Sequence, residues 1–224
     1  MFADISARYD LLNHLLSGSM DKRWRQKVTR RLQGISSEGG RILDVACGTG
    51  DLAFALFEAT GARVVGADFC RPMLEVARRK GSKHKGAVPF VEGDALHLPF
   101  PDRSFDGVTI AFGLRNLSSF EDGLKELLRV AKPGGIVVVL EFSKPTVPGF
   151  RGLFKFYFHR VLPLLGGVVS GSKSAYEYLP DSVTRFPDQQ QLAALMRDAG
   201  FERVDYLNLT GGIAAIHCGI RPRS

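Results

Sequence analysis

The sequence has few cysteines, and their spacing excludes two common kinds of stabilised domain. The three cysteines among 224 residues are Cys47, Cys70 and Cys218. A structural zinc site needs four suitably spaced ligands, and a disulfide-stabilised domain needs paired cysteines. These three residues provide neither, and no cluster of histidines supplements them. We therefore expect a protein of the reducing cytoplasm that uses no metal.

Long uninterrupted apolar runs are also missing. Residues 1–16 alternate polar and apolar side chains in a helical rhythm, whereas a secretory signal has a continuous apolar core. The most apolar segment, 150–169, contains Arg151, Lys155 and Pro163. Charges at that density disfavour a membrane span. We expect a soluble chain.

The excess of positive charge is modest. Thirty lysines and arginines against 23 acidic residues give a net charge of +7. A basic surface attracts polyanions, so nucleic acid and anionic membranes are candidate partners. The basic residues, however, occur in small scattered groups such as 30–31 and 78–80. We interpret them as solvated helix faces and expect no nucleic-acid partner.

The order of the apolar segments predicts an α/β fold. Runs rich in β-branched residues alternate with helical patterns, which is typical of a parallel sheet covered by helices on both faces. The expected strands are 41–46, 63–67, 88–91, 105–111 and 135–142. The expected helices are 21–32, 51–59, 72–80 and 121–130. With no internal repeat and no low-complexity linker, residues 1–224 are expected to form a single domain.

The C-terminal end follows another pattern. A helical segment, 189–199, precedes two strand-like runs, 201–209 and 213–220, which are separated by three residues. So short a connection requires an antiparallel hairpin. The prediction is a seven-stranded, mostly parallel, doubly wound sheet that ends in an antiparallel hairpin.

Two segments lie outside this alternation. Residues 1–33 are predicted to form a helical lid. Residues 143–187 interrupt the order between the fifth strand and the last helix, and we interpret them as a helical insertion over the substrate side.

A glycine loop, Gly48-Thr49-Gly50, follows the first strand. Glycines without Cβ atoms let the backbone approach a ligand and present its amides at a helix N-terminus. Gly48, Gly50 and Ala53 also satisfy the dinucleotide fingerprint, with Asp68 at a suitable distance for a ribose contact. The loop alone therefore does not separate a dinucleotide from another nucleotide ligand.

Three carboxylates favour a different ligand. Asp44, Asp68 and Asp94 lie near the ends of three successive predicted strands, where α/β folds bind ligands. Asp44 suits an ammonium group and would oppose a pyrophosphate. Asp68 suits two ribose hydroxyls, and Asp94 reaches the edge of an adenine. The set favours S-adenosylmethionine, with an NAD-dependent oxidoreductase as the alternative, although each acid alone could be a helix cap or a loop residue.

Longer motifs carry a resemblance to a known family. They include Tyr9-Asp10-Leu11-Leu12-Asn13-His14, Phe112-Gly113-Leu114-Arg115-Asn116, Arg129-Val130-Ala131-Lys132-Pro133-Gly134-Gly135 and Tyr178-Leu179-Pro180-Asp181-Ser182. The chain resembles the ubiquinone/menaquinone biosynthesis C-methyltransferases of the UbiE/MenG type over nearly its whole length. The resemblance implies a class I methyltransferase fold, S-adenosylmethionine as cofactor, and methyl transfer to a ring carbon of a polyprenylated hydroquinone.

The resemblance also implies particular cofactor contacts. These are Thr49, Asp68, Asp94 and Ala95, to which the glycine loop and Asp44 are added by the reasoning above. Thr49 could instead cap the following helix. The chain departs from the family in two places: Asp21 stands where a histidine is common, and the start is short of a lead-in segment.

A hydroquinone ring carbon becomes nucleophilic when an adjacent hydroxyl loses its proton, so the site must stabilise an oxyanion. We expect Arg115 and Asn116 to hydrogen-bond the ring oxygens, and Tyr9, or else His14, to close over the ring. The alternative for Arg115 is an ion pair with a surface acid such as Asp122.

The acceptor's tail and head group are less determined. The phenylalanines of 150–162 are expected to form an apolar wall for the isoprenoid tail, facing a membrane surface, with an ordinary buried helix as the alternative. Demethylmenaquinol is favoured over the benzoquinol by resemblance only. A homodimer and a monomer both stay open, as does a basic nucleic-acid-binding module of this fold.

Overall fold

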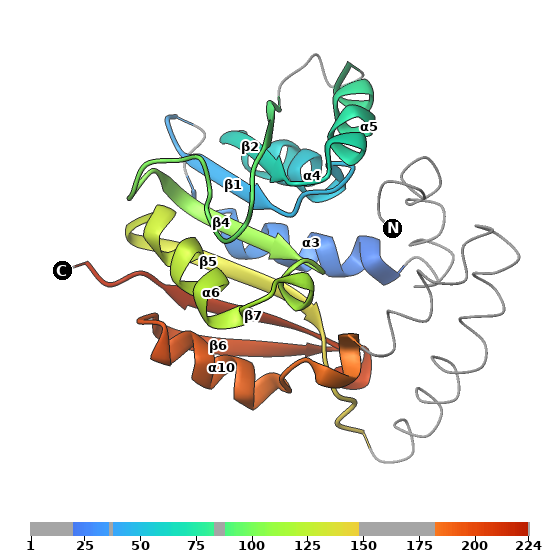
Figure 1. Ribbon diagram of the computed structural model, residues 1–224, viewed down its shortest axis with the longest axis vertical. Coiled ribbons are helices and arrows are strands. Elements are labelled where there is room, and N and C mark those ends of the chain that lie inside the picture. The colour runs from blue at the N-terminus through green and yellow to red at the C-terminus, as the bar shows by residue number, and fades with distance from the viewer. Residues whose placement is uncertain (1–19, 36–37, 83–87, 148–181, 224) are drawn as a thin grey trace, which may run out of the picture.

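A computed structural model describes residues 20–35, 38–82, 88–147 and 182–223 (Figure 1). Its centre is a seven-stranded sheet in the order β3-β2-β1-β4-β5-β7-β6. The strands are β1 (Arg41–Val45), β2 (Arg63–Asp68), β3 (Phe90–Glu92), β4 (Phe105–Ala111), β5 (Ala131–Phe142), β6 (Glu202–Leu209) and β7 (Ala214–Ile220). The helices are α3 (Met20–Leu32), α4 (Asp51–Thr60), α5 (Arg71–Gly81), α6 (Phe120–Val130) and α10 (Gln189–Asp198).

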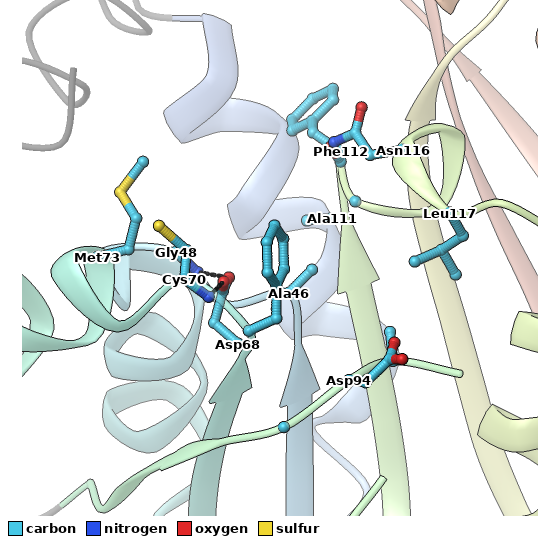
Figure 2. A pocket seen from close by; sticks show the side chains of 14 residues that line it. Ala46, Gly48, Asp68, Cys70, Met73, Asp94, Ala111, Phe112, Asn116 and Leu117 are labelled. Atoms are coloured by element: carbon cyan, nitrogen blue, oxygen red, sulfur yellow. Dashed lines mark hydrogen bonds between the residues drawn. The ribbon is translucent and has the colours of Figure 1, made fainter. Parts of the chain in front are cut away.

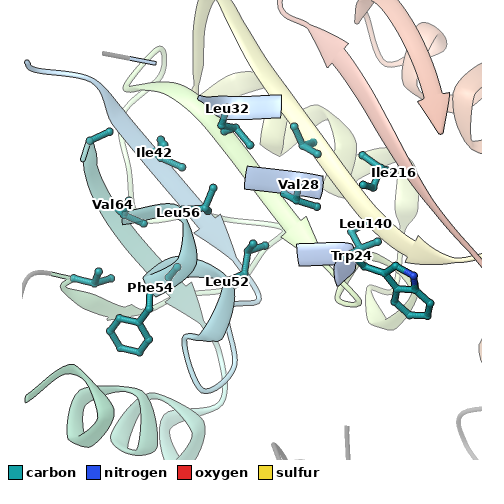
Figure 3. Close-up of a cluster of buried hydrophobic side chains, with 14 of the residues drawn as sticks. Trp24, Val28, Leu32, Ile42, Leu52, Phe54, Leu56, Val64, Leu140 and Ile216 are labelled. Atoms are coloured by element: carbon teal, nitrogen blue, oxygen red, sulfur yellow. The ribbon is translucent and has the colours of Figure 1, made fainter. Parts of the chain in front are cut away.

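Helices cover both faces of the sheet, because neighbouring residues of the central strands point to opposite sides. In β1, Ile42 packs in one apolar cluster with side chains of α3 and α4, whereas Leu43 packs in a second cluster with side chains of α6 and α10. Figure 3 shows the first cluster, in which Trp24, Val28 and Leu32 of α3 lie over the sheet. The predicted doubly wound architecture is confirmed.

The chain reverses its direction of travel across the sheet at β1. From β1 it moves outward through β2 and β3, and it then returns to place β4 on the other side of β1. Helices on opposite faces leave a crevice beyond the carboxyl ends of the two strands at such a point. The ends of β1 and β4 therefore define the place for a ligand.

The C-terminal hairpin also forms as predicted. Strand β7 is antiparallel to both β5 and β6, and the short 3-10 turn Thr210–Gly212 joins the hairpin strands. Gly212 has φ 91°, and a Cβ atom there would lie 2.8 Å from the backbone nitrogen of Thr146. The close approach of these two backbones requires glycine.

Two strands begin more than one residue away from the predicted start. β5 begins at Ala131, before the expected start at 135, because a register shift between Phe105 and Gly107 lets Ala131 pair with Phe105. β3 is shorter than expected and begins at Phe90. Both deviations lie at strand ends, where local irregularity outweighs sequence pattern.

Helix α3 agrees with the second helix expected in the N-terminal lid. The rest of that lid (1–19) and most of the predicted insertion (148–181) lie outside the described residues, so the assignment of a lid and an insertion stays a prediction. Within the described ranges, no helix is long and apolar enough to span a membrane.

Candidate functional site

The turns after β1 and β4 adopt an uncommon backbone conformation. Ala46 has φ 51° and Phe112 has φ 56°, which is the left-handed region that non-glycine residues rarely adopt. A Cβ atom on Gly113 would lie 2.5 Å from the Cβ of Ala46, so the two turns touch only because residue 113 is glycine. Strained turns packed together at a crevice are typical of binding sites.

A first hollow of about 650 Å³, part of it open to solvent, lies against these turns (Figure 2). It is lined by Ala46, Gly48, Asp68, Phe69, Cys70, Met73, Gly93, Asp94, Ala95, Ala111, Phe112, Gly113, Asn116 and Leu117. The structure thus brings together four predicted cofactor residues, Gly48, Asp68, Asp94 and Ala95, with the predicted catalytic residue Asn116.

Asp68 is the last residue of β2, and its carboxylate accepts hydrogen bonds from two loops. Its Oδ2 accepts a hydrogen bond from the backbone nitrogen of Gly48 at 2.8 Å, and its Oδ1 accepts one from that of Cys70 at 2.8 Å (Figure 2). Burial raises the pKa of Asp68, and these hydrogen bonds oppose the rise. Since a carboxylate offers about four acceptor positions, Asp68 can hold the glycine loop and still accept hydrogen bonds from a ligand's hydroxyls.

Asp94 lies on the other side of the hollow and is exposed. Its Oδ1 accepts a hydrogen bond from the backbone nitrogen of Leu96 at 2.9 Å, and its Oδ2 lies 3.7 Å from Nδ1 of His97. The side chain therefore orders its own loop, which presents the buried Ala95 to the hollow.

A second hollow adjoins the first. Its lining comprises Arg25, Asp44, Ala46, Cys47, Gly48, Thr49, Asp51, Leu52, Ala111 and Phe112. Four of these residues, Ala46, Gly48, Ala111 and Phe112, also line the first hollow. The two spaces therefore meet over the ends of β1 and β4, and together they suit an elongated ligand with two chemically different ends.

Asp44 is the buried acid of the second hollow. Its Oδ1 accepts a hydrogen bond from Oγ1 of Thr109 at 2.7 Å, whereas Oδ2 is buried without a hydrogen-bond partner in the described part of the chain. Burial raises the pKa of Asp44 to about 7. An unsatisfied buried carboxylate oxygen is costly, so this position suits a cationic ligand group that would donate to it.

The glycine loop packs against α5 and β3. Gly50 has φ 85°, and a Cβ atom there would lie 2.8 Å from the ring of Phe90. Oγ1 of Thr49 accepts a hydrogen bond from Nζ of Lys80 at 3.0 Å. The N-cap of α4 is Gly50, with no side-chain cap. The alternative role of Thr49 as a cap for this helix is therefore wrong.

Arg115 forms a buried ion pair at the turn after β4. Its Nη1 lies 2.8 Å from Oε1 of Glu141 and donates to the carbonyl of Phe112, and its guanidinium lies over the ring of Phe142. The alternative ion pair with Asp122 is wrong, since Asp122 lies 3.7 Å from Nζ of Lys125. Nor does Arg115 line either hollow.

Asn116 lines the first hollow, and its Nδ2 donates to the same Phe112 carbonyl at 3.3 Å. The Phe112 turn is thus held by two side chains of the motif on which the resemblance rested. Tyr9 and His14 lie outside the described residues, and their predicted roles stay predictions.

Several residues that line the hollows were not predicted, among them three with large side chains. Phe69, with 67% of its surface exposed, and Met73 line the first hollow, and Arg25 lines the second. A large apolar residue directly after a strand-end acid was the available signal for Phe69. Strand-end spacing gave no signal for Arg25, because it lies 19 residues before Asp44 on a separate helix; its sequence signal was the Trp24-Arg25 pair that follows the N-terminal family motif. Among the described residues, no group of three metal-ligating side chains occurs.

The sequence profile of the ubiE/COQ5 methyltransferase family matches residues 1–221. The chain belongs to this family. A demethylmenaquinone methyltransferase from Thermus thermophilus is 54% identical over 99% of this chain and the whole of the relative. A ubiquinone/menaquinone biosynthesis C-methyltransferase UbiE from Geobacter sulfurreducens is 47% identical over 98% of this chain and 86% of the relative.

Solved structures agree on the fold. An S-adenosylmethionine-dependent methyltransferase from Thermotoga maritima has a TM-score of 0.69 at 20% identity and covers 99% of each chain. Phosphoethanolamine N-methyltransferase 2 from Haemonchus contortus, solved with S-adenosylmethionine, has a TM-score of 0.66 at 16% identity over 88% of this chain and 52% of its own. The predicted family and fold are confirmed. The individual contacts predicted for the donor stay predictions.

Proposed function

We propose that this methyltransferase transfers the methyl group of S-adenosylmethionine to a ring carbon of demethylmenaquinol. The observation that carries the proposal is the 54% identity, over the full length of both chains, with a demethylmenaquinone methyltransferase. The UbiE relative, whose name includes ubiquinone, makes a benzoquinol the second candidate acceptor.

The two joined hollows fit the donor better than they fit a dinucleotide. The orphaned oxygen of Asp44 suits the ammonium of a methionine moiety, and Asp68 and Asp94 suit the ribose and the adenine. A pyrophosphate on the same loop would face carboxylates in both hollows, which is electrostatically unfavourable. When bound, S-adenosylmethionine supplies an electrophilic methyl group.

The acceptor side is built on the turn after β4. Asn116 borders the first hollow and would donate to an oxygen of the quinol ring, which stabilises the negative charge that develops there. Arg115 acts through this turn, because it holds the Phe112 carbonyl and is itself held by Glu141. In this arrangement Arg115 is a positioning residue, and Asn116 is the group that contacts the acceptor.

A methyl-transfer assay with labelled S-adenosylmethionine tests the proposal. The enzyme is offered demethylmenaquinol and the corresponding benzoquinol, each with the same isoprenoid tail. We expect label in the organic phase with demethylmenaquinol, and a lower kcat with Asn116→Ala. Transfer to neither quinol, by an enzyme that binds the donor, would contradict the proposal.

The acceptor's tail places the reaction at a membrane surface in this proposal. The Phe-rich segment expected to meet the tail lies outside the described residues. Replacing Phe154 and Phe158 by Ser should reduce the use of a long-tailed quinol more than that of a short-tailed one, and it should reduce co-sedimentation with vesicles. A homodimer stays a prediction, which sedimentation equilibrium can test.

A further inference from the structure

The N-terminal end of α3 is anchored beside the second hollow by Trp24. This side chain is buried, and its Nε1 donates to Oγ1 of Thr210 at 3.0 Å. Its ring packs against Phe112 and edge-on against Phe142, with centroid separations of 6.0 and 6.4 Å. The next residue, Arg25, is consequently held over the glycine loop and the start of α4.

Arg25 belongs to a compact group of charges at the edge of the second hollow. Its Nη2 forms an ion pair with the buried Asp21, one turn earlier in α3, and lies 3.3 Å from Oδ2 of Asp51. Asp51 also pairs with Lys80, at 2.7 Å. Both ion pairs of Arg25 engage the same nitrogen. A guanidinium has five N–H donors in a planar fork, which suits a further carboxylate.

The second hollow is therefore lined by side chains of opposite charge. The carboxylate of Asp44 lies within it at the end of β1, and the guanidinium of Arg25 lines it from α3. An amino-acid group carries one ammonium and one carboxylate, which match this pair of charges in sign. A single acid would suit any amine, whereas an acid and a guanidinium in one hollow select a zwitterion.

We infer that Arg25 binds the carboxylate of the donor's methionine moiety and that Asp21 positions the guanidinium for this contact. The inference rests on the proposed function, because it assumes that S-adenosylmethionine occupies the two hollows. In this arrangement the ligand carboxylate competes with Asp51 for the guanidinium, and Asp51 retains Lys80 as its partner. The buried Asp21 remains bound to Arg25 in both states.

The test compares two ligands that differ by one group. Calorimetry measures the affinity for S-adenosylhomocysteine and for its decarboxylated analogue, which keeps the ammonium and the nucleoside. We expect Arg25→Gln to weaken S-adenosylhomocysteine binding at least about tenfold, as is usual when one partner of a close charge pair is removed. The decarboxylated analogue should change by no more than about twofold, since it lacks the group that Arg25 contacts.

Two further variants separate binding from positioning. Arg25→Lys keeps the charge without the planar fork, so it should retain part of the preference for the carboxylate-bearing ligand. Asp21→Asn should reduce the same preference by a smaller factor. The matched control is Arg31→Gln, which removes an equal charge from the same helix at an exposed pair with Asp205 and should leave both affinities unchanged.

The outcomes distinguish this inference from the proposed function. An equal loss of affinity for both ligands in Arg25→Gln, or no loss for either, overturns the role of Arg25. Failure of the unaltered protein to bind S-adenosylhomocysteine overturns the assignment of the donor site itself. If Arg25→Gln does not fold because the buried Asp21 has lost its ion pair with Arg25, the neutral pair Asp21→Asn/Arg25→Gln is measured in its place, with circular dichroism to verify folding.

Discussion

Two buried carboxylates at the carboxyl end of the sheet have opposite surroundings. Glu141 in β5 has its charge compensated within the chain by Arg115 and accepts a further hydrogen bond from the backbone nitrogen of Phe142. Asp44 in β1 has the hydroxyl of Thr109 on one oxygen, and its other oxygen is an unsatisfied acceptor among the residues that the structure describes. The difference indicates that the acceptor side is held by an internal ion pair, whereas the donor side is completed by its ligand.

The largest expected effect comes from breaking the internal pair. Arg115→Ala leaves the Glu141 carboxylate buried and unpaired, and we expect a loss of about 3–5 kcal/mol in the free energy of unfolding. Urea denaturation measures it. The double variant Arg115→Met/Glu141→Leu should recover most of this stability yet still have a low kcat, because the Phe112 carbonyl has lost one of its two side-chain donors. Full activity in a stable double variant would remove Arg115 from the positioning role.

Asp44→Asn tests the other buried acid, whose second oxygen is an unsatisfied acceptor. Because burial raises the pKa of Asp44 from 3.8 to about 7, the folded ligand-free protein binds this proton more tightly than the unfolded chain. Its stability should therefore fall as the pH rises from about 4 to about 7, by up to about 4 kcal/mol. An asparagine side chain cannot titrate in this range, so Asp44→Asn should remove this decline.

The same variant should bind the donor more weakly above pH 7, since the ammonium loses its anion. Thermal unfolding at several pH values, with and without S-adenosylhomocysteine, measures both effects. Thr109→Val serves as the comparison, because it removes the hydroxyl and keeps the acid. If the ligand-free stability of Asp44→Asn changes with pH as that of the unaltered protein does, this account of the donor side is contradicted.

A smaller effect is expected from Asp68, which accepts hydrogen bonds from the chain and is proposed to accept others from the ribose. Asp68→Ala releases the backbone nitrogens of Gly48 and Cys70, and we expect about 1.5–3 kcal/mol weaker donor binding in calorimetry. Asp68→Asn should lose less, because its amide oxygen can still accept from one loop. Equal affinity in Asp68→Ala and the unaltered protein would exclude Asp68 from the site.

The smallest effect is expected at Asp94, because this carboxylate is exposed to solvent. Asp94→Asn keeps an acceptor for the backbone nitrogen of Leu96, so donor binding should weaken by only about 0.5–1.5 kcal/mol. The loss should be larger for S-adenosylhomocysteine than for an analogue that lacks the adenine amino group. An equal loss for the two ligands would place Asp94 away from the adenine.

The layers of the fold and the place of the donor site follow from local patterns. Alternating strand and helix segments predicted the doubly wound sheet, and a three-residue connection predicted the hairpin, because both rest on short-range geometry. The acids Asp44 and Asp68 could be placed in the hollows from sequence because each lies in a strand whose carboxyl end points to the crevice. The glycine loop likewise follows its strand directly.

The partners of the charged side chains were decided only by the tertiary structure. Arg115 meets Glu141 and not Asp122 because β5 lies beside β4 in the sheet, and strand order is not encoded in the spacing of either residue. Arg25 reaches the glycine loop because α3 packs across α4 and β5. Sequence by itself thus determined which chemical groups lie at the ends of the strands. Packing between distant segments decided which of these groups are neutralised within the chain and which are left to bind a ligand.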